Sequence, residues 1–330
     1  MRIIVDAFGG DNAPLAILQG CRRAADKLPG VRVALAGPQA AIKAHAELAG
    51  VSLDGLEILD APRVFEMEFE PTSILKENGD TSMAVGLKAL AGKEADAFVS
   101  AGSTGALLVG ATLIVKRIRG VRRAALGAVL PTPGGPFLLL DCGATSDCTP
   151  EMLEHFALLG SAYSAKVLGV ERPNVMLANI GTEANKGDAL RQETYKRLSE
   201  SARIHFGGNI EAREIPRGAC DVVVADGFVG NVILKLYEGL ASTLSNEFKK
   251  VFKRNPVAML GAVFAGGGLL RLKKQMDYSE YGGAPLLGIN GVVIKAHGSA
   301  DAKAVFTAIR QARDCVEGKV VEIIKESLER

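Results

Sequence analysis

The residues best suited to chemistry gather in glycine-rich polar segments, each beside a short apolar run. In open α/β sheets, ligands bind beyond the carboxyl ends of the strands. We therefore expect the ligand-binding residues of this chain in these segments. They are DAFGGDNAP (6–14), SAGSTGA (100–106), DCGATSDCTPE (141–151), NIGTEANKGD (179–188), DGFVGN (226–231) and YGGAPLLGINGVVIKAHGS (281–299).

The segment SAGSTGA is typical of a strand end, a tight turn and the start of a helix. Glycine lets the backbone approach a ligand closely, and the free N–H groups at a helix start favour an anion. Ser103 and Thr104 add hydroxyl donors. The alternative is an ordinary tight turn in which Ser103 caps the helix. The segment contains neither the GxGxxG of dinucleotide-binding proteins nor a P-loop.

Lys186 and Asn231 carry side chains that suit phosphate or carbonyl chemistry. Lys186 could neutralise a phosphate or polarise a carbonyl, and the alternative is a solvated surface lysine. Asn231 is expected at the start of a helix from about residue 232, where its amide either caps the helix or donates to a developing oxyanion. Asp226, a few residues earlier, is predicted to be a turn former.

His297 is the histidine that we retain, because it stands at an expected strand end beside Gly298 and Ser299. This position favours a phosphate contact or a general acid or base. No GxSxG elbow, HExxH motif or clustered carboxylates accompany it, so we expect no catalytic triad, no metal and no cofactor. Five cysteines without a CxxC pair predict no disulfide framework and favour a reducing cytoplasm.

Composition excludes several classes of protein. The 330 residues include 39 Lys or Arg and 37 Asp or Glu, and the net charge of +2 argues against a generally basic nucleic-acid binder. Aromatic residues make up 5% and Trp is absent, so stacking platforms for single-stranded nucleic acid are not expected. Hydrophobic residues make up 48%, enough for a large core. No signal-peptide core fits before Asp6.

Apolar runs that alternate with helical segments predict an α/β fold with a mainly parallel sheet covered on both faces, a three-layer α/β/α arrangement. The uncharged run 97–115 is long enough to span a membrane, but its central polar turn favours a strand followed by a helix. The chain forms either a single α/β unit, 1–330, or two interleaved subdomains. Strands are expected at 2–7, 31–37, 56–61, 95–102, 124–132, 136–144, 175–181 and 221–227, and helices from 14, at 38–49, at 104–117, from 150, from about 232 and at 300–328.

The segment 249–274 has basic flanks and an apolar centre, and we expect it to be helical. Its uncharged stretch contains Pro256 and four glycines, which makes a poor transmembrane span. The pattern favours an interfacial membrane contact or a docking face for an acidic partner, and the alternative is a dimer or domain interface. The residues expected at this contact are Lys249, Lys250, Lys253, Arg254, Leu260, Val263, Phe264, Leu269, Arg271, Lys273 and Lys274.

Taken together, the polar segments resemble those of the bacterial phosphate acyltransferase family, PlsX. The resemblance is carried in order by DAFGGDNAP, VSAGSTGALLVG, DCGATSDCTPE, NIGTEANKG, DVVVADGFVGNVILK and YGGAPLLGINGVVIKAHGS, and covers nearly the whole chain. It implies transfer of a fatty acyl group from acyl-[acyl carrier protein] to inorganic phosphate, giving acyl phosphate for phospholipid synthesis. It also implies a fold similar to phosphotransacetylases and isocitrate or isopropylmalate dehydrogenases, and a cytoplasmic homodimer associated peripherally with the inner face of the cell membrane.

By that resemblance, Lys186 and Asn231 are the expected catalytic residues. Segment 102–105 holds the phosphate with Lys186 balancing its charge, a phosphate oxygen attacks the thioester directly, and Asn231 donates to the oxyanion. Where the family is expected to have asparagine this chain has Ser103, which still donates and accepts a hydrogen bond. The expected phosphate- or substrate-binding residues are Asp6, Gly9, Gly10, Asn12, Gly102, Ser103, Thr104, Gly105, Asp141, Asn179, Asp226, Gly227, Gly230 and His297.

An acidic carrier protein requires a basic patch on this nearly neutral chain. Two candidates are Lys249–Arg254 with Arg271–Lys274, and the cluster Arg117, Arg119, Arg122 and Arg123. Three other functions stay open: a CoA-dependent phosphate acetyl- or butyryltransferase, a dehydrogenase of the isopropylmalate type, and a non-catalytic peripheral membrane scaffold. The scaffold leaves the polar segments unexplained, and no obvious acidic cluster supports the metal site of the dehydrogenase.

Overall fold

The computed structural model describes residues 1–253, 266–268 and 281–329. The strands are β1 Arg2–Asp6, β2 Arg32–Gly37, β3 Glu57–Asp60, β4 Ala97–Ser100, β5 Ala125–Thr132, β6 Gly135–Leu140, β7 Asn174–Asn179, β8 His205–Glu211, β9 Val222–Val224, β10 Ala284–Leu287 and β11 Val292–Lys295. The α-helices are α1 Leu15–Lys27, α2 Gln39–Leu48, α3 Ser82–Ala91, α4 Thr104–Gly110, α5 Pro150–Val167, α6 Ala189–Glu200, α7 Gly227–Lys253, α9 Ala302–Glu317 and α10 Val320–Glu329. Short 3₁₀ turns lie at Pro71–Leu75 and Ile215–Arg217.

The strands form one sheet in the order β3-β2-β1-β4-β11-β10-β5-β6-β9-β7-β8. Most neighbours are parallel, so the predicted mainly parallel α/β sheet is confirmed. The exceptions are central: β10 is antiparallel to β11 and to β5, and β5 is antiparallel to β6. These three reversals make the set β3-β2-β1-β4-β11 run opposite to the set β6-β9-β7-β8. The carboxyl ends of the two sets therefore lie at opposite edges of the sheet.

Alternate residues of each strand face different helical layers, as the two-residue period of a strand requires. On β1, Ile3 and Val5 join a large core with residues of α1, α5, α9 and α10, while Ile4 packs with residues of α3 and α4. On β6, Leu138 joins the same large core, while Leu139 belongs to a third cluster that includes residues of α7. One face of the sheet thus has a continuous core, and the other has two separate cores.

Two predicted helices are not the continuous α-helices that the sequence predicts. The helix expected at 300–328 is broken into α9 and α10, because Lys319 adopts the left-handed conformation with φ +51°. The helix expected at 104–117 is an α-helix only as far as Gly110, and a π-helical turn, Ala111–Lys116, continues it. The predicted start of α5 is confirmed, since the Thr149 hydroxyl accepts a hydrogen bond from the N–H of Met152 at 3.4 Å.

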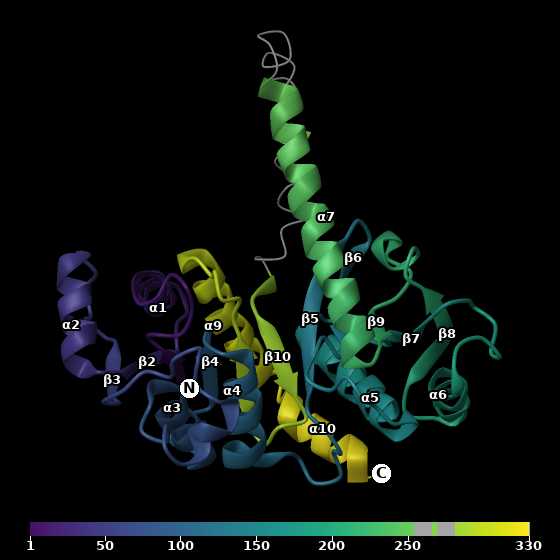
Figure 1. Ribbon diagram of the computed structural model, residues 1–330, viewed down its shortest axis with the longest axis horizontal. Helices are drawn as coiled ribbons and strands as arrows, with labels where there is room; N and C mark the ends of the chain where they lie inside the picture. Colours follow the sequence, from purple (N-terminus) through teal and green to yellow (C-terminus); the bar gives the residue numbers. More distant parts are fainter. Residues whose placement is uncertain (254–265, 269–280, 330) are drawn as a thin grey trace.

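Helix α7 is 27 residues long, and its C-terminal part projects well beyond the sheet (Figure 1). Apolar side chains repeat along it at four-residue intervals, and each is more than half exposed. They are Phe228, Val232, Leu236, Leu240 and Leu244, which we call the α7 stripe. In the described part of the chain, no helix has both the length and the apolar character needed to cross a membrane.

Candidate functional site

The first group of predicted site residues lies at the carboxyl ends of β1, β4 and β11. Asp6 is only 2% exposed, and its carboxylate accepts hydrogen bonds from the hydroxyls of Ser82 at 2.7 Å and Ser100 at 2.8 Å. Burial raises the pKa of Asp6, and the two hydroxyls oppose that shift. A Cβ atom at Gly9 would lie 2.6 Å from the backbone nitrogen of Gly102, so glycine permits the loops after β1 and β4 to touch.

The loop after β11 joins the same group. The Asn12 side chain donates to the carbonyl of Ser299 at 3.0 Å, and Gly10, with φ +98°, packs against the carbonyl of Gly298. His297 is exposed, and its Nδ1 accepts a hydrogen bond from the N–H of Ser299 at 3.2 Å. The structure therefore brings Asn12, Gly10 and His297 beside Asp6 and the loop after β4, as the sequence predicts for residues at strand ends.

The turn after β4 has a definite local role. The Ser103 hydroxyl accepts a hydrogen bond from the N–H of Ala106 at 3.4 Å, so the capping alternative is confirmed for this residue. Gly105 packs against Pro71, with room for no more than a tight Cβ contact at 3.0 Å. Thr104 is exposed, which leaves its hydroxyl accessible to a ligand.

Sequence reasoning missed Lys295, the last residue of β11. It is 8% exposed, and its ammonium group donates to the carbonyls of Ala101, at 3.1 Å, and of Ala296. Burial lowers the pKa of Lys295 to about 8. The available signal was a single charge at the end of the apolar run VVIK.

The second group lies at the carboxyl ends of β6, β7 and β9. Asp141 is fully buried after β6, and its carboxylate accepts hydrogen bonds from the backbone N–H groups of Leu126 at 2.8 Å, Ala144 at 3.1 Å and Thr145 at 2.7 Å. Burial raises the pKa of Asp141, and these N–H donors oppose the shift. The carboxylate thus fixes the conformation of the glycine-containing loop that follows β6.

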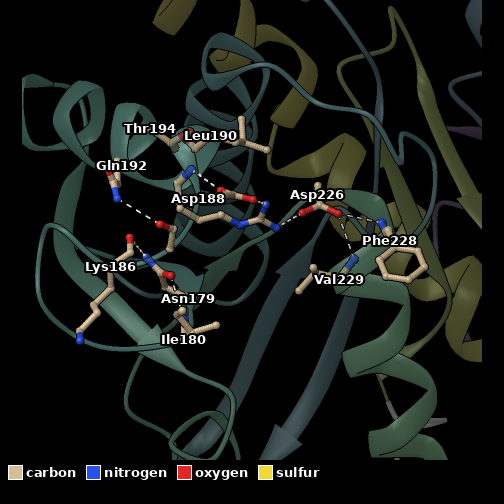
Figure 2. Close-up of polar contacts among 12 residues, drawn as sticks. Asn179, Ile180, Lys186, Asp188, Leu190, Gln192, Thr194, Asp226, Phe228 and Val229 are labelled. Atoms are coloured by element: carbon tan, nitrogen blue, oxygen red, sulfur yellow. Dashed lines mark hydrogen bonds and ion pairs between the residues drawn. The ribbon is translucent and has the colours of Figure 1, made fainter.

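Asn179 fixes the next loop in a similar way. Its side chain accepts a hydrogen bond from the N–H of Ile180 at 2.8 Å and donates to the carbonyl of Lys186 at 3.1 Å. Gly187 has φ +84°, and a Cβ there would meet the Asn179 amide at 2.5 Å. The Lys186 side chain is exposed and extends away from Asp226 (Figure 2). In the part of the chain that the structure describes, its ammonium group has no polar partner.

Asp226 caps α7, and this explains why the helix starts at Gly227 rather than near residue 232. Its carboxylate accepts hydrogen bonds from the N–H groups of Phe228 at 3.1 Å and Val229 at 3.0 Å (Figure 2). The same carboxylate forms an ion pair with Arg191, a residue that the sequence did not single out, and both side chains are largely buried. The turn-forming role predicted for Asp226 is therefore replaced by two roles, a helix cap and an ion-pair partner.

Gly230 and Asn231 lie in the first turns of α7. A Cβ at Gly230 would lie 1.8 Å from the carbonyl oxygen of Asp141, so α7 packs directly on the loop after β6. The capping alternative for Asn231 is wrong, because it is the fifth residue of the helix. Its exposed amide has no polar partner among the described residues, and a Cβ on Gly143 would lie 3.8 Å from its side chain.

A charge on helix α7 acts on the first group from the second. Lys235 follows Asn231 by four residues and therefore shares its helix face. The positive charge of Lys235 contributes to lowering the pKa of Lys295, which belongs to the first group. Although the two groups lie at the ends of oppositely directed strands, a charge on the face of α7 that carries Asn231 thus acts on the first group.

The cysteines near the second group do not suit nucleophilic catalysis. Burial raises the pKa of Cys148 to about 11 and holds that of Cys142 well above its ordinary value. Both thiols are therefore protonated near neutral pH, and the thiolate is the reactive form. The described residues contain no group of three or more His, Cys, Asp or Glu side chains that could hold a metal ion.

The predicted contact segment 249–274 is described only in part. Lys250 lies on α7, with its ammonium group 2.6 Å from Glu247. In the alternative basic cluster, Arg122 pairs with Glu151 at 3.1 Å and Arg117 donates to the carbonyl of Arg122. The residues that lie outside the described ones are Arg254, Leu260, Val263, Phe264, Leu269, Arg271, Lys273 and Lys274, together with the side chains of Lys249 and Lys253.

Solved structures with this fold include acyl-transferring enzymes. The EutD phosphotransacetylase from Staphylococcus aureus superimposes with a TM-score of 0.62 and 17% identity, over 95% of this chain and 94% of that one. A branched-chain phosphotransacylase from Enterococcus faecalis V583 gives a TM-score of 0.58 and 15% identity, over 96% of this chain and 99% of that one. The predicted similarity to phosphotransacetylases is confirmed, and the fold is that of the phosphotransacylase class.

Sequence comparison identifies the family to which the chain belongs. A family model described as "Fatty acid synthesis protein" matches residues 1–323. The phosphate acyltransferase of Caldanaerobacter subterraneus subsp. tengcongensis is 45% identical over 329 residues, which cover 100% of this chain and 98% of that protein. The phosphate acyltransferase of Desulfitobacterium hafniense is 46% identical over 331 residues, with the same coverage. The chain belongs to the phosphate acyltransferase family.

Proposed function

We propose that this protein transfers an acyl group from a thioester, acyl-[acyl carrier protein], to inorganic phosphate and so forms an acyl phosphate. The family supports the reaction type. The observation that carries the assignment is the Asn231 amide, which is exposed and unpartnered within the described residues, beside the loop that Asp141 fixes. An amide held on a helix next to a rigid loop is a suitable oxyanion donor.

The attacking group is the phosphate itself, because the neighbouring thiols are held protonated. A phosphate oxygen forms a bond to the thioester carbonyl carbon, and the carbonyl electrons move to its oxygen. That oxyanion accepts a hydrogen bond from the Asn231 amide. When the carbonyl re-forms, the C–S bond breaks, its electron pair leaves with sulfur, and the thiolate takes a proton from solvent.

The structure bears on how the two predicted catalytic residues divide their roles. Lys186 stands with the second group, whereas segment 102–105, where phosphate is expected, stands with the first. We therefore assign Lys186 to the thioester donor rather than to the balancing of phosphate at 102–105. Asp6, Asn12, Asp141, Asn179 and Asp226 hold the surrounding loops and the start of α7, as their hydrogen bonds indicate.

The test is acyl phosphate formation from palmitoyl-[acyl carrier protein] and phosphate, trapped as a hydroxamate, with EDTA present and palmitoyl-CoA as a parallel donor. Loss of one oxyanion donor typically lowers turnover by about 10²–10³-fold, and we expect this for Asn231→Ala. Asn246→Ala, an exposed change further along α7, is the matched control and should retain activity. For Lys186→Ala the control is Lys196→Ala on α6. Normal turnover in folded Asn231→Ala would refute the assignment.

Donor preference separates the remaining alternatives. Phosphate-dependent product from palmitoyl-CoA alone would favour the CoA-dependent enzyme. No product from either donor would favour the scaffold or the dehydrogenase. The exposed Arg119 and Arg123 have no partner among the described residues and are available to an acidic carrier protein. Their reversal to Glu should raise KM for the carrier-bound donor, and an unchanged KM would place docking elsewhere.

We also propose that the protein is a homodimer in which the α7 stripe is buried, and that 249–274 contacts the membrane surface. The five apolar side chains of the α7 stripe form a continuous exposed line along the helix rather than scattered surface residues, and their burial against a second copy would be favourable. Leu240→Asp should convert the dimer to a monomer in sedimentation or light scattering, whereas Asn246→Asp on the same helix should not. Flotation with anionic vesicles tests the membrane contact independently.

A further inference from the structure

The buried ammonium group of Lys295 has no use in the mechanism above. Its side chain is more than nine-tenths buried. It makes two hydrogen bonds, to the carbonyls of Ala101 and Ala296, whereas an ammonium group has three N–H donors. In the described part of the chain, no carboxylate lies within 4.0 Å of its nitrogen.

A buried cation without a contacting anion is costly, because it has lost most of its hydration and gained no ion pair in return. Two acids act on it through their charge alone: Asp11, in the loop after β1, and Asp6 on β1 both favour the charged form. Lys235 on α7 opposes it, and burial is the largest influence. An arriving anion would supply the missing contact.

The residues around the Lys295 ammonium group indicate which kind of anion would bind there. The carbonyl of Ala101 that Lys295 contacts precedes Gly102, the first residue of the segment expected to hold phosphate. The exposed Thr104 hydroxyl lies in that same turn, and the exposed His297 ring lies two residues beyond Lys295. Hydroxyl, imidazole and ammonium donors together suit a small, multiply charged oxyanion better than the single charge of a carboxylate.

We propose that Lys295 supplies the positive charge of a phosphate-binding site between the loops after β4 and β11, an inference that rests on the function proposed above. The site lies on the first group, and from α7 the charge of Lys235, four residues after Asn231, acts on Lys295. Lys295 therefore holds the attacking phosphate, while Lys186 and Asn231 act on the thioester.

Calorimetric titration of the full chain with inorganic phosphate at pH 7.5 and pH 9.5 tests this site. Phosphate is mainly dianionic at both values, whereas Lys295, with a pKa of about 8, loses its proton between them. Because phosphate binds the charged form, affinity in the wild-type protein should fall by about twentyfold as the pH rises. Equal affinity at the two pH values would overturn the proposal.

Substitutions of Lys295 give a second, independent test of the phosphate site. Lys295→Arg keeps its charge at pH 9.5, so phosphate affinity should no longer fall with pH. Lys295→Met should weaken binding at pH 7.5 by about thirtyfold or more, in the range found when one partner of a buried charge pair is removed. Lys186→Met should keep the wild-type pH dependence. A lysine that merely ties two loops together would leave all three pH profiles alike.

The proposal and the proposed function can fail separately. If acyl phosphate forms but substitution of Lys295 leaves phosphate affinity unchanged, the proposed phosphate site is wrong and the proposed reaction is retained. If phosphate binds with the expected pH dependence but no acyl phosphate forms, the site stands and the reaction is wrong.

Discussion

The ion pair between Asp226 and Arg191 should be worth several times more than the ion pair that the same arginine makes with Asp188. Both aspartates cap a helix, and both contact the Arg191 guanidinium. They differ in burial: the Asp226 side chain is 6% exposed, the Asp188 side chain 59%, and Arg191 15%. The two substitutions to asparagine keep the capping oxygen and remove only the charge, so together they isolate the effect of burial.

Breaking a buried pair by removing one partner costs about 3–5 kcal/mol, and Asp226→Asn should fall near the lower end because Arg191 retains Asp188. Asp188→Asn should cost less than about 1 kcal/mol, as an exposed pair does. Asp226→Ala also removes the cap of α7, which adds about 1 kcal/mol. The free energy of unfolding in urea measures all three. Equal losses for the two asparagine variants would show that burial does not set the strength of this ion pair.

Two further predictions concern Gly230 and Lys295. Gly230→Ala would place a Cβ 1.8 Å from the Asp141 carbonyl, so it should lower the melting temperature and turnover together, whereas Gly239→Ala, with open space around it, should raise helix stability by up to about 1 kcal/mol. The pKa of Lys295 is lowered on folding from 10.5 to about 8, so the unfolded chain binds more protons between these values and stability rises with pH there. The pH dependence of unfolding should therefore flatten across that window in Lys295→Met, and an unchanged slope would contradict the assignment.

Local sequence patterns predict most of the helices and strands, but they do not predict which strands run antiparallel to their neighbours. Runs such as 2–7 and 31–37 indicate buried strands because their central residues are apolar. The reversal at β10 depends on a four-residue strand within the segment 281–299, and its pairing with β5, far away in sequence, leaves no local periodicity. The sequence also does not predict the break between α9 and α10, because the helical spacing of apolar residues continues past Lys319.

The candidate site was predictable to the extent that its residues follow strands. Asp6, Asp141 and Asp226 were found because glycine and polar residues mark strand ends, and all three lie there. The structural role of each carboxylate could not be predicted from the sequence, because its partners are distant in the chain. Asp6 accepts a hydrogen bond from Ser82, and Asp226 forms an ion pair with Arg191. The sequence did not predict Lys295 as a site residue for the same reason, since it is buried by packing against the loop after β4.

The position of β11 has a consequence for synthesis on the ribosome. This strand lies between β4 and β10, and α9, which follows it, packs in the same core as α1. The strands β1 to β4 therefore emerge first and pair among themselves, but β4 lacks its second neighbour until nearly all of the chain has been translated. The strands β5 to β9 also pair among themselves, and β5 likewise lacks its second neighbour until β10 emerges. Because β10 and β11 join these two sets of strands, the sheet is expected to become continuous only near the end of translation.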